Sequence, residues 1–348
     1  MKAVPASRTA SGSADRLNAS AVICVYSLDR LEAIVDATHS LLDQTCQPRE
    51  VIVVADRVDG LPPALKHRLP SDVQIVENRW GQGLSNARNT GLHASSGDLI
   101  SFLDDDAVAA PDWLERLEAN FHDPRVVAAG GRAVPQWLGS GVRPQWFPEE
   151  LDWIVGCTFK GFANGQRNVR NVLGSNMCFR RGVLERTGGF DARLGGPISG
   201  DDTEVCLRIL ATDDSYRIVY EPAAVVHHKV PPERQTLRYL LYSSWDQGAG
   251  KAVIKRLHPR HGQALASEAS YLRYLSREFF PHSLKRLVGG NWQGGAHMVA
   301  TVLAISAVGY GYFTARAKDS FLRKGLRRSD LGCVSPTAET VDGDSHEG

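Results

Sequence analysis

Three consecutive carboxylates follow an apolar run in this chain. Residues 100–103 are Ile-Ser-Phe-Leu, and they are followed by Asp104, Asp105 and Asp106, which is typical of a buried strand that opens into a polar crevice. Adjacent carboxylates repel one another unless a cation or hydrogen-bond donors compensate their charge. Mg²⁺ and Mn²⁺ prefer oxygen ligands and usually also hold phosphates. The triplet therefore indicates a metal and phosphate site, with a solvated acidic turn as the alternative.

Polar residues also follow two earlier apolar runs. Tyr26 and Ser27 come at the end of the run 21–26, and Asp56 follows the β-branched run 51–54. In open α/β sheets, ligands bind outside the carboxyl ends of the strands. Carboxylates suit the ribose hydroxyls and the base edge of a nucleotide, and a metal suits its diphosphate. The three strand ends together predict a nucleotide site.

The elements that position these residues alternate between strands and helices. Apolar runs predict strands at 21–26, 51–54, 73–76 and 98–103, and helical spacing predicts helices at 28–45, at 84–95 and from residue 111. This alternation predicts a doubly wound α/β half. The first strand–helix turn lacks Gly-x-Gly-x-x-Gly, so we expect no dinucleotide redox cofactor.

The second part of the chain has two further candidate groups. Asp201 and Asp202 precede a helix at 205–210, where carboxylates either cap the helix or act as a general base. His227 and His228 follow a strand at 217–220, and either one is a metal ligand or both are structural. Residues 130–170 are rich in Gly, Trp and Pro and predict an irregular lid or acceptor platform, or a loop anchored by its aromatic residues.

Taken in order, these motifs resemble the family-2 glycosyltransferases, which have the GT-A fold. The similarity extends from about Ser20 to His228. That fold combines a Rossmann-like nucleotide-binding half with a mixed-sheet acceptor half. The resemblance depends on the segments 23–27, 51–56, 78–91, 104–106, 189–191 and 201–204.

The resemblance implies a role for each candidate residue. Asp56 and Arg88 would contact the base of a nucleotide-sugar donor, Asp104 would hold its ribose, and Tyr26 and Asp105 complete the donor site. Asp106 would coordinate Mg²⁺ or Mn²⁺ on the diphosphate, with His228 as an additional metal ligand. Asp202 would deprotonate an acceptor hydroxyl, which attacks the anomeric carbon and inverts its configuration. UDP-sugar is the favoured donor, although Val25, Ser27 and Ala55 depart from the family pattern at the nucleoside side.

The C-terminal part differs in charge from the rest of the chain. Residues 251–330 contain 14 Lys and Arg against 4 Asp and Glu, whereas the whole chain has a net charge of +1. We expect a lead-in at 1–19 and a tail at 329–348, both disordered, around a catalytic domain at 20–230 and a helical region at 231–328. Within that region, helices are predicted at 234–245, 248–255 and 271–280. The uncharged segment 298–315 has basic flanks, which favour a hairpin or an interfacial segment against anionic lipid over a single membrane span. A buried helix of a soluble bundle is the alternative. We expect no nucleic-acid partner.

The predicted function is transfer of one sugar from a nucleoside-diphosphate sugar to a glycan, lipid-linked or small-molecule acceptor. A Gln-x-x-Arg-Trp motif of processive synthases is absent from the sequence. The alternatives are a sugar-nucleotide pyrophosphorylase, although residues 26–30 contain no glycine for its phosphate loop, and a non-catalytic binding module. Residues 1–20 lack the apolar run of a signal peptide and the six cysteines form no Cys-x-x-Cys pair. We therefore expect a cytoplasmic location, either free in the cytoplasm or at the inner face of the cell membrane. The sequence leaves the oligomeric state unassigned.

Overall fold

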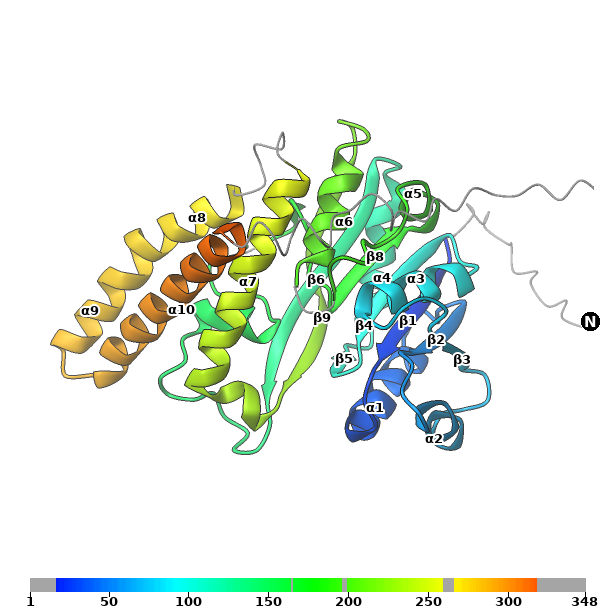
Figure 1. The fold of residues 1–348 in the computed structure, drawn as a ribbon, viewed down its shortest axis with the longest axis horizontal. Coiled ribbons are helices and arrows are strands. Elements are labelled where there is room, and N and C mark those ends of the chain that lie inside the picture. Colours follow the sequence, from blue (N-terminus) through cyan, green and yellow to red (C-terminus); the bar gives the residue numbers. More distant parts are fainter. Residues whose placement is uncertain (1–16, 164, 196–198, 259–265, 318–348) are drawn as a thin grey trace, which may run out of the picture.

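The fold is organised around one mixed β-sheet (Figure 1). The computed structural model describes residues 17–163, 165–195, 199–258 and 266–317, so residues 1–16 of the predicted lead-in and the predicted tail at 329–348 lie outside the described residues. The strands run in the order β3-β2-β1-β4-β8-β6-β9-β5, and β7 pairs with β9. Their bounds are β1 (Ala19–Val25), β2 (Glu50–Ala55), β3 (Gln74–Glu77), β4 (Leu99–Asp104), β5 (Ala107–Ala109), β6 (Val126–Trp137), β7 (Arg167–Asn168), β8 (Asn176–Arg180) and β9 (Arg217–Val230).

Helices cover both faces of the sheet and continue beyond it. Their bounds are α1 (Leu31–Leu42), α2 (Leu61–Arg68), α3 (Leu84–Ala94), α4 (Trp113–Glu118), α5 (Arg181–Arg186), α6 (Asp201–Leu210), α7 (Leu237–Leu257), α8 (Ala266–Tyr274), α9 (Phe280–Val288) and α10 (Trp292–Ala317). Buried apolar residues of α1, α2 and α4 belong to one cluster, and most of those of α3, α5 and α6 belong to a second.

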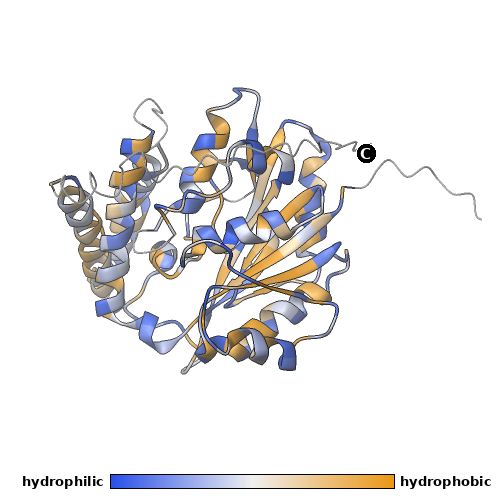
Figure 2. Cartoon of the chain, turned by 45° about the vertical axis from the view of Figure 1, so that its right-hand side comes forward, coloured by the Kyte–Doolittle hydropathy of each residue, from blue (hydrophilic) through white to orange (hydrophobic). Residues whose placement is uncertain are grey.

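The two clusters lie on opposite faces of the sheet because side chains alternate along a strand. In β1, Ile23 and Val25 belong to the first cluster, while Val22 and Cys24 belong to the second. Figure 2 shows the strands in hydrophobic colours between helices that are hydrophobic on one side. Burying one such aliphatic side chain contributes about 1.5–3 kcal/mol. The sheet is therefore a rigid frame for the polar residues at its strand ends.

Parallel pairing brings the carboxyl ends of the first strands to one edge. β1 pairs with β2 and β4, so that Val25 lies opposite Ala55, and Cys24 lies opposite Asp104. The residues that follow each strand therefore share one rim, as the sequence predicts. β8 is antiparallel to both β4 and β6, which makes the second half of the sheet mixed.

The structure differs from the sequence predictions in three segments. Residues 126–137 form the long strand β6, so the prediction that 130–170 is irregular is wrong for its first part. The region predicted as two helices, 234–245 and 248–255, forms the single helix α7. The helix α2 was not predicted, because Pro62 and Pro63 are poor helix formers except in the first turn, where they lie.

Candidate active site

The end of β4 brings three potential metal ligands together. Asp104 ends this strand, Asp106 lies two residues later, and His228 comes from β9. One ligand atom from each of the three side chains lies within 4.8 Å of the other two. The His228 Nε2 atom is 3.1 Å from Asp106 Oδ1 and 3.9 Å from Asp104 Oδ2. This spacing fits a site for a single cation.

Strand pairing explains why a histidine so far along the chain reaches the triplet. β5 begins directly after Asp106 and pairs antiparallel with β9, which puts Ala107 opposite His228. The His228 side chain is buried, whereas its neighbour His227 is exposed, as expected from the alternation of side chains. Two carboxylates and an imidazole form a donor set that fits a divalent cation such as Mn²⁺ or Mg²⁺.

Two arginines compensate the charge of the acidic triplet. Arg30 follows β1, and its Nη1 atom lies 2.9 Å from Asp105 Oδ1 while its Nη2 atom contacts Asp106. Arg234 lies in the 3₁₀ helix Pro232–Gln235, and its Nη1 atom is 3.1 Å from Asp106 Oδ2. Asp106 therefore contacts two guanidinium groups and one imidazole. The two arginines and the protonated His228 imidazole thus balance the three carboxylates of the triplet.

The electrostatic environment separates the pKa values of neighbouring groups. Burial raises the pKa of Asp105 to about 7, although the Arg30 charge lowers it. Burial also acts to raise the pKa of Asp106, but the charges of His228, Arg30 and Arg234 hold it below the usual range. Burial alone would lower the pKa of His228, but Asp106 and Asp104 raise it to about 9. His228 would have to lose this proton to ligate a cation, because imidazole ligates metals in its neutral form.

Arg88 joins the end of β4 to the start of α6. It lies on the buried face of α3, and its side chain is 3% exposed. Its Nη1 atom donates to Asp201 Oδ2 at 2.6 Å, and its Nη2 atom donates to Gly174 O at 3.1 Å and to Asp104 Oδ1 at 3.4 Å. A side chain so placed fixes the distance between the two acidic motifs. These contacts give Arg88 a positioning role that the sequence does not reveal.

Asp202 lies beside this network at the first turn of α6. Its Oδ2 atom accepts a hydrogen bond from the Gly174 N–H at 3.0 Å, and its Oδ1 atom accepts one from the Thr203 N–H at 2.6 Å. Burial and the neighbouring Asp201 carboxylate raise the pKa of Asp202. A carboxylate with a raised pKa is a stronger base, which is what proton abstraction from a hydroxyl requires.

The two residues predicted at the nucleoside side differ in their exposure. Tyr26 is 52% exposed, and its ring lies 5.0 Å from the Arg30 guanidinium. Asp56 is buried at the end of β2 and accepts hydrogen bonds from Asn78 Nδ2 at 2.6 Å and from the Gly83 N–H at 2.9 Å. Tyr26 is therefore half-exposed beside Arg30, while Asp56 holds the loop that leads into α3.

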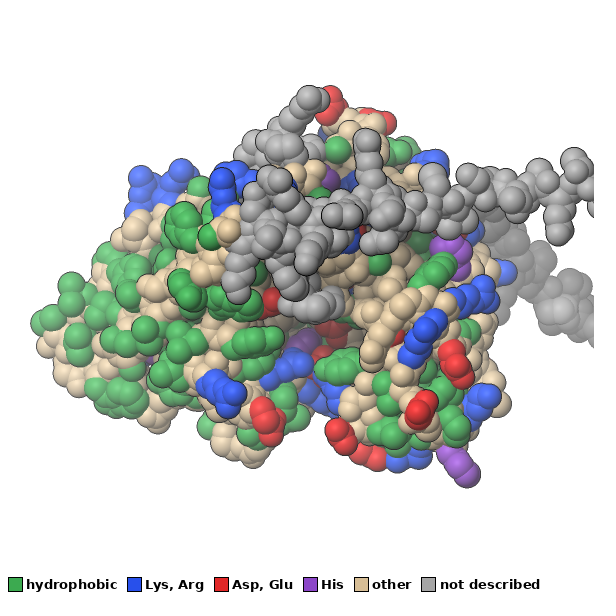
Figure 3. Space-filling model, in the orientation of Figure 1, with side chains coloured by type: hydrophobic (Ala, Val, Ile, Leu, Met, Phe, Trp, Pro, Cys, Tyr) green, Lys and Arg blue, Asp and Glu red, His purple; other side chains and the backbone are tan. Residues whose placement is uncertain are grey.

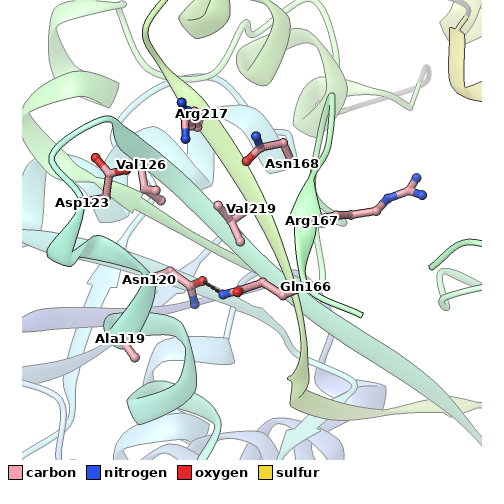
Figure 4. A pocket seen from close by; sticks show the side chains of 9 residues that line it. All are labelled: Ala119, Asn120, Asp123, Val126, Gln166, Arg167, Asn168, Arg217 and Val219. Atoms are coloured by element: carbon pink, nitrogen blue, oxygen red, sulfur yellow. Dashed lines mark hydrogen bonds between the residues drawn. The ribbon is translucent and has the colours of Figure 1, made fainter. Parts of the chain in front are cut away.

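A pocket on the opposite rim contains none of these residues. It has a volume of about 440 Å³ and lies where β6 and β9 begin, near Val126 and Arg217 (Figure 4). Across it, Gln166 Nε2 donates to Asn120 Oδ1 at 2.7 Å. His228 lies near the other end of β9. The pocket is therefore separate from the candidate active site.

Comparison with known proteins identifies the family. The model of glycosyl transferase family 2 matches residues 20–188. A glucosyl-dolichyl phosphate glucuronosyltransferase from Haloferax volcanii is 33% identical over 304 residues, which are 85% of this chain and 95% of that relative. This chain belongs to glycosyl transferase family 2. The succinoglycan biosynthesis protein ExoM from Rhizobium meliloti is 27% identical to this glycosyltransferase over 270 residues, which are 72% of this chain and 76% of that relative.

A solved structure supports the fold of this glycosyltransferase. The mannosyltransferase PcManGT from Pyrobaculum calidifontis, in complex with GDP-Man and Mn²⁺, aligns with a TM-score of 0.51 at 19% sequence identity, covering 84% of this chain and 88% of that protein. The predicted family, the GT-A fold and the prediction that the chain is an enzyme are confirmed.

The structure brings most of the predicted site residues to one rim of this glycosyltransferase. Sequence reasoning missed two residues, Arg30 and Arg234. A signal for Arg30 was present, because it follows a strand end that already had a candidate residue, Tyr26. Arg234 gives no such signal, because it is more than 120 residues from Asp106 in the sequence and meets it through the packing of β9 and α7.

Proposed function

We propose that this glycosyltransferase moves one sugar from a nucleoside-diphosphate sugar to a hydroxyl of a lipid-linked acceptor, with inversion at the anomeric carbon. The main support for this proposal is that Arg88 contacts both acidic motifs. This residue contacts Asp104 of the cation cluster and Asp201, the neighbour of Asp202. A donor site and a general base are thereby held in one rigid unit, which is what a direct displacement requires.

Asp104, Asp106 and His228 would hold the divalent cation. Bound there, the cation supplies charge stabilisation for the departing nucleoside diphosphate. The imidazole in the donor set favours Mn²⁺ over Mg²⁺, since Mg²⁺ prefers an octahedron of oxygen atoms. Arg30 and Arg234, which contact Asp106 in this structure, lie where charge-assisted hydrogen bonds to the diphosphate would further stabilise the leaving group.

The nucleoside would lie along the ends of β1 and β2. The exposed ring of Tyr26 offers a surface on which a base can stack, and Asp56 supplies a carboxylate at the next strand end. Asp104 would accept a hydrogen bond from the ribose, while Asp105 holds Arg30 in place through its 2.9 Å contact. A UDP-sugar is the favoured donor.

Asp202 would act as the general base. Its carboxylate would take the proton of the acceptor hydroxyl as the oxygen attacks the anomeric carbon from the side opposite the diphosphate. The bond between the anomeric carbon and the diphosphate oxygen breaks as the new glycosidic bond forms, so one displacement inverts the configuration. The hydrogen bonds from Gly174 and Thr203 fix the orientation of the carboxylate.

Two observations support a lipid-linked acceptor. The Haloferax volcanii relative is named for action on glucosyl-dolichyl phosphate and is similar over 95% of its length. The C-terminal helix α10 is long and apolar enough to cross a membrane by length and composition. A location at the inner face of the cell membrane fits both observations.

The test is a nucleotide-release assay with Mn²⁺, with UDP-glucose, UDP-glucuronic acid or GDP-mannose as donor and a polyprenyl-phosphate-linked glucose as acceptor. Asp202→Asn is expected to lower turnover by about 10²–10⁴-fold, the usual contribution of a general base, and to leave donor affinity unchanged. Asp213→Asn, an exposed carboxylate in the turn after α6, is the matched control and should change neither. Unchanged turnover in Asp202→Asn removes this residue from the mechanism, and a product with retained anomeric configuration refutes the single displacement.

The two alternative functions are less well supported than glycosyl transfer. A pyrophosphorylase also uses a nucleotide and a metal, but the family-2 model matches residues 20–188, and the Haloferax volcanii glycosyltransferase is similar over 85% of this chain. A binding module would need neither Asp202 nor a raised pKa at that position. If nucleotide is released only when acceptor is present, the activity is glycosyl transfer and neither of the two alternatives.

A further inference from the structure

The C-terminal helices present many apolar side chains to solvent. Figure 3 shows hydrophobic side chains gathered over the part of the surface where α7, α9 and α10 lie in Figure 1. Soluble monomers rarely expose contiguous apolar patches of more than a few hundred Å². We call this surface the apolar face; it comprises Leu237, Leu241 and Trp245 on α7, Leu284 and Val288 on α9, and Val299, Val302, Tyr310 and Phe313 on α10.

α10 contributes one continuous side to this face. Val299, Val302, Tyr310 and Phe313 fall within an arc of about 80° when each residue turns the helix by about 100°. The buried residues of the helix, including Ala300 and Ala304, lie on the opposite side against the core of the catalytic domain. Only 22% of its most apolar 18-residue window is buried. α10 therefore is not the enclosed helix of a soluble bundle, the alternative that the sequence left open.

Close packing against α7 fixes the direction of α10. A Cβ atom added to Gly311 would lie 2.0 Å from Trp245 O, and one added to Gly248 would lie 2.0 Å from Val308 O. The two backbones are therefore in direct contact. α7 also contains Arg238, Asp246 and Lys251, and charged groups at the centre of a bilayer are costly. The α7–α10 pair therefore suits the surface of a membrane better than its interior.

The charges of α9 and α10 are complementary to anionic lipid. Lys285 and Arg286 lie in the last turn of α9, and Arg316 lies in the last turn of α10. The sequences of α9 and α10 contain no Asp or Glu. Basic residues beside a membrane are attracted to anionic headgroups by about 1 kcal/mol each. Aromatic side chains such as those of Trp245 and Tyr310 also favour the boundary between headgroups and acyl chains.

We propose that the apolar face binds the surface of an anionic lipid bilayer, with α10 parallel to the membrane plane. The consequence for catalysis rests on the proposed function. Leu237 of the apolar face is three residues after Arg234, whose Nη1 atom is 3.1 Å from Asp106. Figure 3 shows acidic, basic and histidine side chains in a hollow beside the hydrophobic patch. Docking therefore puts the active site next to the headgroup layer, where the sugar of a lipid-linked acceptor lies.

The test is flotation of the full-length protein with vesicles of phosphatidylcholine, with and without about 30% phosphatidylglycerol. We expect binding to the anionic vesicles, with weaker binding when salt is raised from about 0.1 M to about 1 M. Val302→Asp combined with Phe313→Asp, both at exposed positions, should lower the bound fraction at least about 10-fold, since each adds a charge that must be desolvated. His67→Asp, at an exposed site on α2, adds a carboxylate in the nucleotide-binding half, outside the apolar face, and should leave binding unchanged.

Three results would overturn this proposal. The first is equal flotation of the double variant and the unaltered protein, or flotation of neither. The second is concentration-dependent dimerisation that the double variant abolishes without any vesicle binding, which would make a second copy the partner. The third is resistance of membrane-bound protein to extraction by alkaline carbonate, which would indicate a spanning helix. Donor-nucleotide binding, measured on the same samples by thermal shift, tests the donor site of the proposed function separately, because it needs no membrane.

Discussion

Replacement of Arg88 tests the view that one buried guanidinium unites the donor site and the catalytic base. Its side chain is 3% exposed and its partner Asp201 is 7% exposed, with 2.6 Å between Nη1 and Oδ2. Arg88→Met keeps most of the side-chain volume but leaves the Asp201 carboxylate buried without its cation. Breaking a buried pair in this way costs about 3–5 kcal/mol. That is a large share of a total stability of about 5–15 kcal/mol.

The assay is urea denaturation followed by tryptophan fluorescence and by circular dichroism. Arg88→Met should unfold at a clearly lower urea concentration, and Arg88→Met/Asp201→Asn should recover part of the loss because the buried charge is removed with its partner. A double-mutant cycle should give a coupling energy of about 2–3 kcal/mol, at the upper end for contacting residues. Arg68→Met is the matched control, because Arg68 forms a two-bond pair with Glu32 on the exposed surface, where ion pairs contribute little.

Equal effects of Arg88→Met and Arg68→Met on stability would refute this reasoning. So would additive effects of Arg88→Met and Asp201→Asn, because additivity means that the two side chains do not depend on each other in the folded protein.

Three further predictions concern the cation, the base and the helix contact. Asp106→Ala should abolish metal-dependent nucleotide binding in calorimetry, because it removes a carboxylate of the cluster; binding that still requires metal would place the cation elsewhere. As the pH is lowered, the rate of sugar transfer should begin to fall above pH 4, the ordinary pKa of Asp being about 4. The reason is that burial and Asp201 raise the pKa of Asp202, and only the deprotonated carboxylate is a base. A rate that stays constant down to about pH 4.5 argues against this carboxylate as the base. Gly311→Ala should destabilise the protein by about 1–3 kcal/mol, because the added methyl group overpacks against α7. Gly309→Ala should stabilise it by up to about 1 kcal/mol, because a Cβ atom there meets nothing within 4 Å. Equal melting temperatures for the two variants would show that α10 does not lie against α7 as described.

Local patterns in the sequence were sufficient to predict the first half of the sheet. The uninterrupted apolar runs of β1, β2 and β4 predicted parallel strands, and their pairing puts the following polar residues on one rim. The same period-two rule explains which of two adjacent histidines faces the site. His228 is buried and His227 is exposed, but the choice depends on the register between β5 and β9, which the sequence does not state.

Contacts between distant segments were beyond the sequence. Arg88 was predicted to contact a nucleobase, yet in the structure its guanidinium is paired with Asp201, 113 residues away. Arg30 reaches the acidic triplet from near the start of the predicted catalytic domain, and Arg234 reaches it from just after the end of that domain. Gly248 suggested a break between two helices, but it lies inside α7 where the backbone of α10 comes close. In each case the partner is fixed by tertiary packing, which overrides local propensity.

The central claim is that Asp104, Asp106 and His228 form a metal-dependent site for a nucleoside diphosphate. The most direct measurement is a thermal-shift panel of UDP, GDP, dTDP and CDP, each with and without Mn²⁺. A ligand at about 100 times its dissociation constant stabilises the folded state by about 2.7 kcal/mol, which raises the melting temperature by a few degrees. We predict a rise with one nucleotide, UDP in the favoured case, that requires Mn²⁺ and disappears in Asp106→Ala. A rise that is the same without metal, or none with any nucleotide, would contradict the claim.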